Sequence, residues 1–387
     1  MLEQILAYHE DLAAIRQDLH AHPELGMQEH RTSGIVAEKL AGWGIEVHRD
    51  VGRTGVVGVL RRGNGPASIG LRADMDALPI LEATGLAYAS TRPGVMHACG
   101  HDGHTTMLLG AARYLAEHGR FNGTVNFIFQ PAEEGLGGAE AMLADGLFAR
   151  FPCDTVFGMH NRPGLAVGLA AARSGPMMAG AAIFDIVITG RSAHAARPED
   201  SADPVLAAAT LTTALQSIVS RNLPAQDAAV LSVTWLQSGG AYNIIPETAT
   251  LRGTVRAFGR ETMQKVEQRM RVLAESMAAE FGAQAAVDFK FLFAPLVNDA
   301  EQATVFASVA AKLLGEAQTE RTGPAVMVSE YFSFMLEVRP GAYIKIGNGE
   351  ASAPVHNDRY YFNDAALPIG AGLYASLVVR KLAASPI

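Results

Sequence analysis

The residues of this chain with the clearest chemical potential stand together in the octapeptide HACGHDGH at 97–104. It contains three histidines, one cysteine and one aspartate, directly before a segment with helical periodicity. Thiolate sulfur and imidazole nitrogen are typical ligands of Zn²⁺ and of other borderline divalent cations. A helix that merely begins with polar residues does not require this density of ligands, so the octapeptide predicts a metal or catalytic site.

Three further polar segments could complete such a site. Glu133 and Glu134 follow an apolar strand expected at 124–130, and adjacent carboxylates point in different directions, so one can bind a metal while its neighbour holds a proton. His160 ends a strand expected at 155–159, and His356 lies in a turn after 347–349. Ligand sites of open α/β sheets collect at the carboxyl ends of the strands. We therefore expect these segments to meet at one edge of a sheet.

Two segments in the middle of the chain carry weaker signals. His194 ends a strand within GRSAHA at 190–195, where small neighbours leave room for a substrate or another chain. Asn243 stands in the turn-rich stretch GGAYNIIP at 239–246, which could present its amide. From the residues alone, a simple surface loop explains His194 equally well.

The elements that must position these residues follow two different patterns. Strands alternate with helices at both ends of the chain, which predicts an α/β fold with a mostly parallel sheet. The expected helices are 2–19, 32–40, 102–119, 139–143, 303–314 and 365–382, and the strands are 56–60, 68–72, 124–130, 155–159 and 342–346. Between them lie strands at 182–189, 229–236, 248–258 and 285–293, with helices at 204–220 and 261–281. This β-α-β-β-α-β order predicts an inserted ferredoxin-like domain at 176–294 within a domain formed by 1–175 and 295–387.

Composition excludes several classes of protein. The 387 residues are 49% hydrophobic and 18% charged, which is enough apolar material for a sizeable core and too much for disorder. The net charge of −8 argues against a nucleic-acid or anionic-membrane surface. Two cysteines cannot build a disulfide framework, and neither a signal peptide nor a membrane span is indicated. We expect a soluble cytoplasmic protein.

Taken together, the motifs resemble those of the M20 metallopeptidases, in particular the amidohydrolase branch of hippurate hydrolases, aminoacylases and indole-acetyl-amino-acid hydrolases. Nine motifs occur in the family's order: LHAHPEL at 19–25, RADMDALP at 72–79, HACGHDGH at 97–104, QPAEEG at 130–135, GMHN at 158–161, GRSAHA at 190–195, GGAYNIIP at 239–246, GTVR at 253–256 and VHN at 355–357. The resemblance implies a zinc-peptidase-like α/β catalytic domain interrupted by an α+β ferredoxin-like lid, which often serves dimerisation.

The resemblance also implies the metal ligands. Two divalent ions per subunit, Zn or Mn before Co or Ni, would be bound by Cys99, His101, Glu134, His160 and His356. Cys99 would bridge the two ions, with His101 and His160 on one ion and with Glu134 and His356 on the other.

Further roles come from the same resemblance. Glu133 would act as general base and then as general acid, and His194 would stabilise the oxyanion from the lid, frequently the lid of a partner subunit. Asn243 would contact the substrate, while Asp74 and Asp102 are candidates for orienting the ligand imidazoles.

These roles predict a homodimeric amidohydrolase that cleaves small N-acyl-amino acids, such as benzoylglycine, to a carboxylic acid and an amino acid. The alternatives are a metal-dependent dipeptidase or carboxypeptidase of the same fold, a cysteine hydrolase with Cys99 as nucleophile, and a non-catalytic binding protein. Three residues depart from the branch: Arg162 replaces a frequent Trp, Tyr331 replaces an Asp, and Asp358 replaces a common Pro. These departures are expected to alter substrate preference rather than metal binding. Cys153 is expected to be a buried free thiol, and His20, His22 and His97 are expected to be structural.

Overall fold

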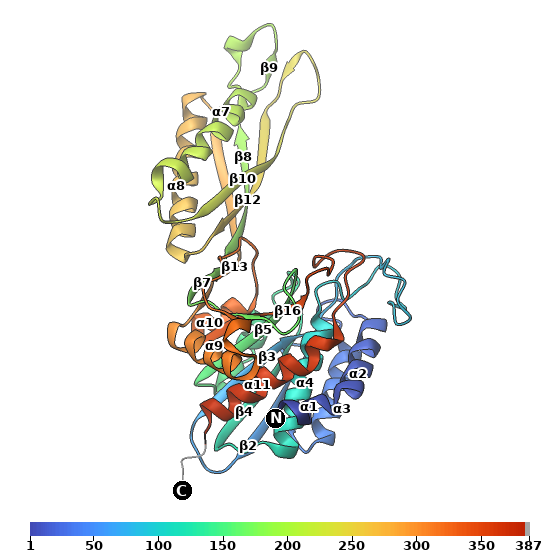
Figure 1. Cartoon of the computed structure of the whole chain (residues 1–387). Coiled ribbons are helices and arrows are strands. Elements are labelled where there is room, and N and C mark those ends of the chain that lie inside the picture. Colours follow the sequence, from blue (N-terminus) through green and yellow to red (C-terminus); the bar gives the residue numbers. More distant parts are fainter. Residues whose placement is uncertain (384–387) are drawn as a thin grey trace. The chain divides into compact units, whose positions relative to one another are not determined.

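The computed structural model describes residues 1–383, which fold into two compact units (Figure 1). Unit 1 comprises Met1–Gly175, Val297–Pro324 and the described residues from Phe334 onward. Unit 2 comprises Pro176–Leu296 and Ala325–Ser333. The chain passes between the units within the short elements β7 (Gly175–Met178), β14 (Leu296–Asn298) and α10 (Phe332–Val338), and after Pro324.

Unit 1 is built on an eight-stranded sheet. In spatial order its strands are β1 (Glu46–Val51), β2 (Gly55–Arg62), β4 (Gly123–Gln130), β3 (Ser68–Asp74), β5 (Thr155–Pro163), β16 (Gly341–Gly349), β6 (Ala170–Ala171) and β15 (Thr319–Glu320). The central strands β4, β3, β5 and β16 are parallel, as the alternating pattern predicts. The pairs β1–β2, β2–β4 and β16–β6 are antiparallel. All eight residues of β4 except Thr124 are buried, as expected for a central strand.

The helices of unit 1 are α1 (Leu2–Leu6), α2 (His9–Ala21), α3 (His30–Gly42), α4 (His101–His118), α5 (Gly138–Ala144), α6 (Leu147–Arg150), α9 (Ala300–Leu314) and α11 (Leu367–Lys381). Helix α4 packs against α2, α3 and α11 and against β3, and its apolar stripe joins the main core. The prediction of one helix over 2–19 is wrong, because α-helical hydrogen bonding is interrupted at Tyr8. The Tyr8 amide donates to the carbonyl of Ile5, three residues earlier, rather than to a carbonyl four residues earlier. The Tyr8 side chain instead docks on α4, where its ring lies under the Arg113 guanidinium at 4.0 Å.

Unit 2 has a four-stranded antiparallel sheet in the order β10 (Ala229–Ser238), β12 (Thr248–Ala257), β8 (Gly180–Thr189) and β13 (Gln284–Phe293). Helices α7 (Pro204–Ser217) and α8 (Arg260–Glu280) pack against this sheet around a core that includes Phe184, Leu211 and Leu251. In chain order this is β-α-β-β-α-β, so the predicted fold class is confirmed: an α/β unit interrupted by an α+β ferredoxin-like unit. Two short strands, β9 (Ala193–His194) and β11 (Ile244–Ile245), pair beyond the main sheet.

Across residues 1–383, no helix combines the length and the apolar character required to cross a membrane.

Candidate metal centre

Five side chains from four segments of unit 1 converge at the carboxyl ends of the parallel strands. Ligand atoms of Cys99, His101 and His160 all lie within 4.8 Å of one another, and so do those of Cys99, Glu134 and His356. Cys99 is common to the two groups. These are the five residues that the resemblance implies as ligands, in the same two sets; their roles as ligands remain a prediction.

Local backbone conformation brings these side chains to the centre. Gly100 adopts φ +94° directly before α4, and a Cβ there would lie 2.3 Å from the Asn161 amide nitrogen, so only glycine fits between Cys99 and His101. Ala132 and His356 are non-glycine residues with φ of +49° and +62°. Such conformations cost free energy and concentrate at functional sites.

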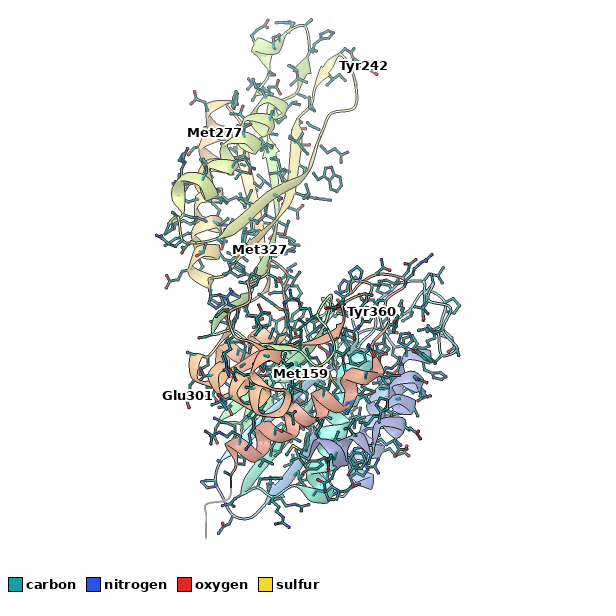
Figure 2. All side chains as sticks on the ribbon, viewed as in Figure 1. Met159, Tyr242, Met277, Glu301, Met327 and Tyr360 are labelled. Atoms are coloured by element: carbon teal, nitrogen blue, oxygen red, sulfur yellow. The ribbon has the colours of Figure 1, made fainter. Side chains whose placement is uncertain are left out.

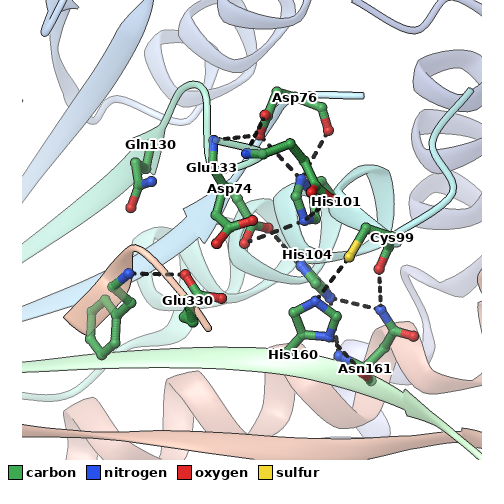
Figure 3. A network of polar contacts seen from close by, with 12 residues as sticks. Asp74, Asp76, Cys99, His101, His104, Gln130, Glu133, His160, Asn161 and Glu330 are labelled. Atoms are coloured by element: carbon green, nitrogen blue, oxygen red, sulfur yellow. Dashed lines mark hydrogen bonds and ion pairs between the residues drawn. The ribbon is translucent and has the colours of Figure 1, made fainter. Parts of the chain in front are cut away.

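Two imidazoles are held with one nitrogen free for a cation. The Nδ1 atom of His101 lies 2.9 Å from the Asp76 carbonyl oxygen, and that of His160 lies 2.6 Å from the Asn161 carbonyl oxygen. Because a carbonyl only accepts, Nδ1 must be the donor, and Nε2 of each ring, in its neutral form, directs a lone pair toward the centre. The Nε2 of His160 lies 3.3 Å from the Cys99 sulfur (Figure 3).

One buried polar atom of the centre, His101 Nε2, lacks a hydrogen-bond partner among residues 1–383, and Glu134 Oε1 lies 3.2 Å from His356 Nε2. An unsatisfied buried polar atom destabilises a fold by about 1–3 kcal/mol, and a bound cation would satisfy His101 Nε2. The thiol, imidazole and carboxylate donors suit Zn²⁺ or a similar ion. The residues therefore fit a metal site.

Burial affects the protonation of these groups strongly. Burial, together with the charge of Glu134, raises the pKa of the Cys99 thiol well above its usual range. Burial and the neighbouring His104 hold the pKa of His160 well below its usual range. A neutral imidazole is ready to bind a metal, whereas the Cys99 thiolate requires a nearby cation for its stabilisation.

Asp76 is the positioning residue that the sequence did not reveal. Its two carboxylate oxygens each accept a backbone N–H at 2.9 Å, one from Glu133 and one from Glu134, and Oδ1 also lies 3.2 Å from His101 Nδ1 (Figure 3). One side chain thus fixes the predicted base and two predicted ligands. The available signal was its position two residues after Asp74 in the strand-ending motif RADMDALP.

The role of Asp74 in orienting a ligand imidazole stays a prediction, and its Oδ2 lies 3.8 Å from Nε2 of the predicted ligand His101. Asp74 accepts from Arg72 at 2.8 Å and pairs with His104 at 2.6 Å, whereas Asp102 pairs with His20 at 2.8 Å. Asp102 therefore supports the surrounding scaffold through His20, whereas Asp74 contacts both His104 and the ring of His101.

Asn161 follows His160 in β5 and connects this strand to the segment before α4 that carries Cys99. Its backbone N–H donates to His104 Nε2 at 3.0 Å, so the neutral His104 ring carries its proton on Nδ1, toward Asp74. Its side-chain amide donates to the Cys99 carbonyl at 2.7 Å and its side-chain oxygen accepts from the Tyr360 hydroxyl at 2.8 Å. The backbone of Cys99 is thereby tied to the end of β5.

Unit 2 brings His194 and Asn243 together. His194 lies opposite Ile244 in the β9–β11 pair, and the Ala195 N–H donates to the Asn243 carbonyl at 3.0 Å. Both side chains are exposed, as is the adjacent Tyr242 (Figure 2). The Nδ1 atom of His194 accepts the Ala196 N–H at 3.1 Å, so the neutral ring carries its proton on Nε2, the end free to donate to another group.

An α/β sheet with a cluster of Cys, His and Glu side chains at its carboxyl edge is the arrangement expected of a metal-dependent hydrolase. Comparison with known proteins supplies the family. The model of peptidase family M20/M25/M40 matches residues 70–380, and the chain belongs to this family.

Individual relatives agree with this membership. The chain is 44% identical to a hippurate hydrolase of Campylobacter jejuni, with 99% of both chains covered, and 40% identical to an N-acetylcysteine deacetylase of Bacillus subtilis, with 97% and 98% covered. It matches the crystal structure of a Bacillus subtilis dinuclear metal-binding peptidase of the M20 family with a TM-score of 0.86, 36% identity and coverage of 97% and 99%. The resemblance to the amidohydrolase branch is thereby confirmed, and the chain is an enzyme that hydrolyses amide bonds.

Proposed function

We propose that this protein is a dinuclear metal-dependent amidohydrolase that cleaves N-acyl-amino acids of the hippurate type to a carboxylic acid and an amino acid. The observation that carries the proposal is the presence of two donor groups that share the Cys99 sulfur, with Glu133 beside the ligand Glu134. The names of the relatives, a hippurate hydrolase and a deacetylase of N-acetylcysteine, support a small acylated amino acid as the substrate.

The proposed ligands are Cys99, His101 and His160 for one ion and Cys99, Glu134 and His356 for the other, with Zn or Mn as the expected metal. When bound, divalent cations polarise a carbonyl oxygen and lower the pKa of water. The protein's contribution is to hold the imidazole rings with Nε2 directed inward, by the Nδ1 contacts of His101 and His160 described above.

Glu133 is the proposed general base and acid. It is buried, a carboxylate oxygen lies within 4.8 Å of ligand atoms of His101 and Glu134, and its backbone is fixed by Asp76. A carboxylate so placed can accept a proton from water as the water attacks the amide carbon. It can then deliver that proton to the leaving amine nitrogen.

Unit 2 is the proposed lid and dimerisation domain. The Nε2–H of His194 would donate to the oxyanion, and Asn243, on the same strand pair, would contact the substrate. Within the described chain, β10 pairs only with β12, so its other edge is free. A free edge strand invites pairing with a second chain, which supports a homodimer through this unit. We propose a cytoplasmic location, since Cys99 must remain reduced to act as a ligand.

Substitution of Glu133 by Gln tests the proposal. Because the amide cannot accept a proton, we expect hydrolysis of N-benzoylglycine to fall by at least about 10³-fold, with metal content unchanged by elemental analysis. Glu140→Gln, a matched change at an exposed site on α5, is the control and should retain wild-type activity. Near-normal turnover by Glu133→Gln would remove Glu133 from the mechanism.

The cysteine hydrolase alternative is disfavoured by the environment of Cys99. Its sulfur lies 3.3 Å from His160, as a nucleophile–base pair would require, but burial raises the pKa of the thiol, whereas a reactive thiolate needs a lowered pKa. Activity that survives complete chelation and is abolished by thiol alkylation would establish this alternative instead. A panel of N-acyl-amino acids and dipeptides distinguishes an amidohydrolase from a peptidase.

A further inference from the structure

Two cationic side chains stand on the face of the sheet that carries His160. Strands β5 and β16 are parallel, with Lys345 paired to His160 and Gly347 paired to Arg162. Side chains of paired residues project from the same face of a sheet, and so do those two residues apart in one strand. Lys345 and Arg162 therefore share the face of the predicted ligand His160, near the carboxyl ends of their strands, and both are partly buried.

Neither cation is neutralised by a neighbour. Over residues 1–383, no carboxylate lies within ion-pair distance of Lys345 or Arg162, and neither side chain makes a hydrogen bond. Glu320 stands on the same face across Ala171, but it is exposed and forms no ion pair with Lys345. Burial and the charge of Arg162 lower the pKa of Lys345 to about 8. Two unneutralised cations side by side are unfavourable, and a bound anion would relieve this cost.

The distance of the two cations from the predicted metal ligand His160 suits a group of the substrate rather than a free ion. Neighbouring strands lie about 5 Å apart, and residues i and i+2 of one strand lie about 7 Å apart, so both cations start within about 7 Å of His160 along the sheet. An anion held by the Lys345 ammonium and the Arg162 guanidinium would lie a few bonds from an amide bound at the metal centre. A guanidinium fork and an ammonium together match a carboxylate.

We propose that Lys345 and Arg162 form a subsite for a second carboxylate of the substrate, so that the enzyme prefers N-acyl-amino acids with an additional acidic group. This inference deepens the proposed function and rests on it. The additional carboxylate lies either on the acyl group or on the amino-acid side chain, and two pairs of substrates separate these cases.

The test uses the metal-loaded full chain and compares each acid with its neutral amide. N-succinylglycine is paired with N-succinamoylglycine, and N-benzoyl-L-glutamate is paired with N-benzoyl-L-glutamine. In one of these pairs we expect kcat/KM to favour the acid by at least about tenfold, because the amide leaves the cations unpaired. The pair that shows the preference identifies the part of the substrate that reaches the subsite.

Substitutions then assign the preference to the two residues. Lys345→Met and Arg162→Gln each remove one charge and should lower the ratio of acid to amide toward one. The ratio between two matched substrates is independent of a general loss of activity, and metal content by elemental analysis reports whether the centre is intact. Lys265→Met removes one charge from the exposed face of α8 and should leave the ratio unchanged.

A binding measurement keeps the subsite separate from the chemistry. By calorimetry, glutarate should bind about tenfold more tightly than its monoamide, and Lys345→Met should abolish this difference. If none of the substrates, nor N-benzoylglycine, is hydrolysed, the proposed function fails while the calorimetric comparison still decides the subsite. If neither substrate pair nor glutarate shows a preference for the acid, or if the preference survives both substitutions, the subsite is overturned.

Discussion

The two predicted parts of the active site are built in opposite ways. In unit 1 the predicted ligands Cys99 and His101 are buried, and buried neighbours such as Asp76 and Asn161 each make several hydrogen bonds to their surroundings. In unit 2 the exposed His194 is fixed by one backbone N–H, and its loop is held by only a two-residue strand pair. Protein contacts therefore fix the positions of the predicted ligands in unit 1, whereas the side chains of His194 and Asn243 in unit 2 have few protein contacts to fix them.

The sharpest test of this difference is His194→Ala. Loss of the donor to an oxyanion typically lowers kcat by about 10²–10³-fold. Because His194 is exposed and supports no core, metal content and thermal stability should stay at wild-type values. Steady-state kinetics with N-benzoylglycine, elemental analysis and thermal unfolding measure the three quantities.

The same variant tests action across a dimer. Mixing His194→Ala with Glu133→Gln subunits should restore part of the activity if each site uses the histidine of its partner. A drop in thermal stability of His194→Ala would contradict the contrast between the units, since it would show that the loop stabilises the fold.

The buried network of unit 1 should instead make stability depend on pH. Burial opposes a charge on His20, but hydrogen bonds to Asp102 and Glu82 prevail and raise its pKa from 6.5 to about 9. The folded state therefore binds this proton more tightly, and the stabilisation is complete below pH 6.5 and is lost as the pH rises through 9. The shift corresponds to an upper limit of about 3 kcal/mol.

Chemical unfolding of the metal-loaded protein between pH 6.5 and 9 tests this pH dependence, with His20→Gln as the comparison. The wild type should lose stability over this range, and the variant should be less stable at pH 6.5 but should change less. The pKa of Asp102 is lowered by the same contact, but that contribution is lost only under acidic conditions. If the free energy of unfolding changed with pH in the same way in both proteins, the contact between His20 and Asp102 would contribute nothing to stability.

Asp76→Asn should weaken metal binding. The amide can still contact His101 but cannot accept two backbone N–H groups with both of its terminal atoms, so Glu133 and Glu134 lose part of their support. Removing such a partner of a metal ligand typically lowers metal affinity by about 10–100-fold. Titration against a competing chelator measures this change, and unaltered affinity would show that the ligands hold their positions without Asp76.

The sequence predicted the parts of this protein that depend on residue type and periodicity. Both fold patterns and the clustering of Cys99, His101 and Glu134 were accessible, because ligand types were dense and strands ended next to them. Cys153 is a buried free thiol, as expected, and burial raises its pKa to about 12.

What the sequence could not show depends on contacts between distant segments. The role of Asp76 requires the backbone amides of a loop 57 residues later to face its carboxylate, and no side-chain pattern reports where an amide points. The break at Tyr8 depends on docking against Arg113 of α4, which overrides a continuous helical pattern. The exposed and charged edge strand β1 carries no apolar alternation to signal a strand.

The smallest expected effect lies on the open face of unit 2, at Asp185→Asn. Asp185 pairs with Arg252 at 2.5 Å, but the two side chains are 40% and 48% exposed, and Arg252 also stacks on the Trp235 ring at 4.1 Å. An exposed ion pair contributes about 0.2–1 kcal/mol, and the ring contact remains in the variant. The free energy of unfolding, measured by thermal unfolding, should therefore fall by at most about 1 kcal/mol, and by less at high salt. A larger loss of stability would mean that this face of unit 2 is covered in solution, as a dimer through this face would require. The difference between the exposed carboxylate Asp185 and the buried carboxylates of unit 1 would then hold only for the isolated subunit.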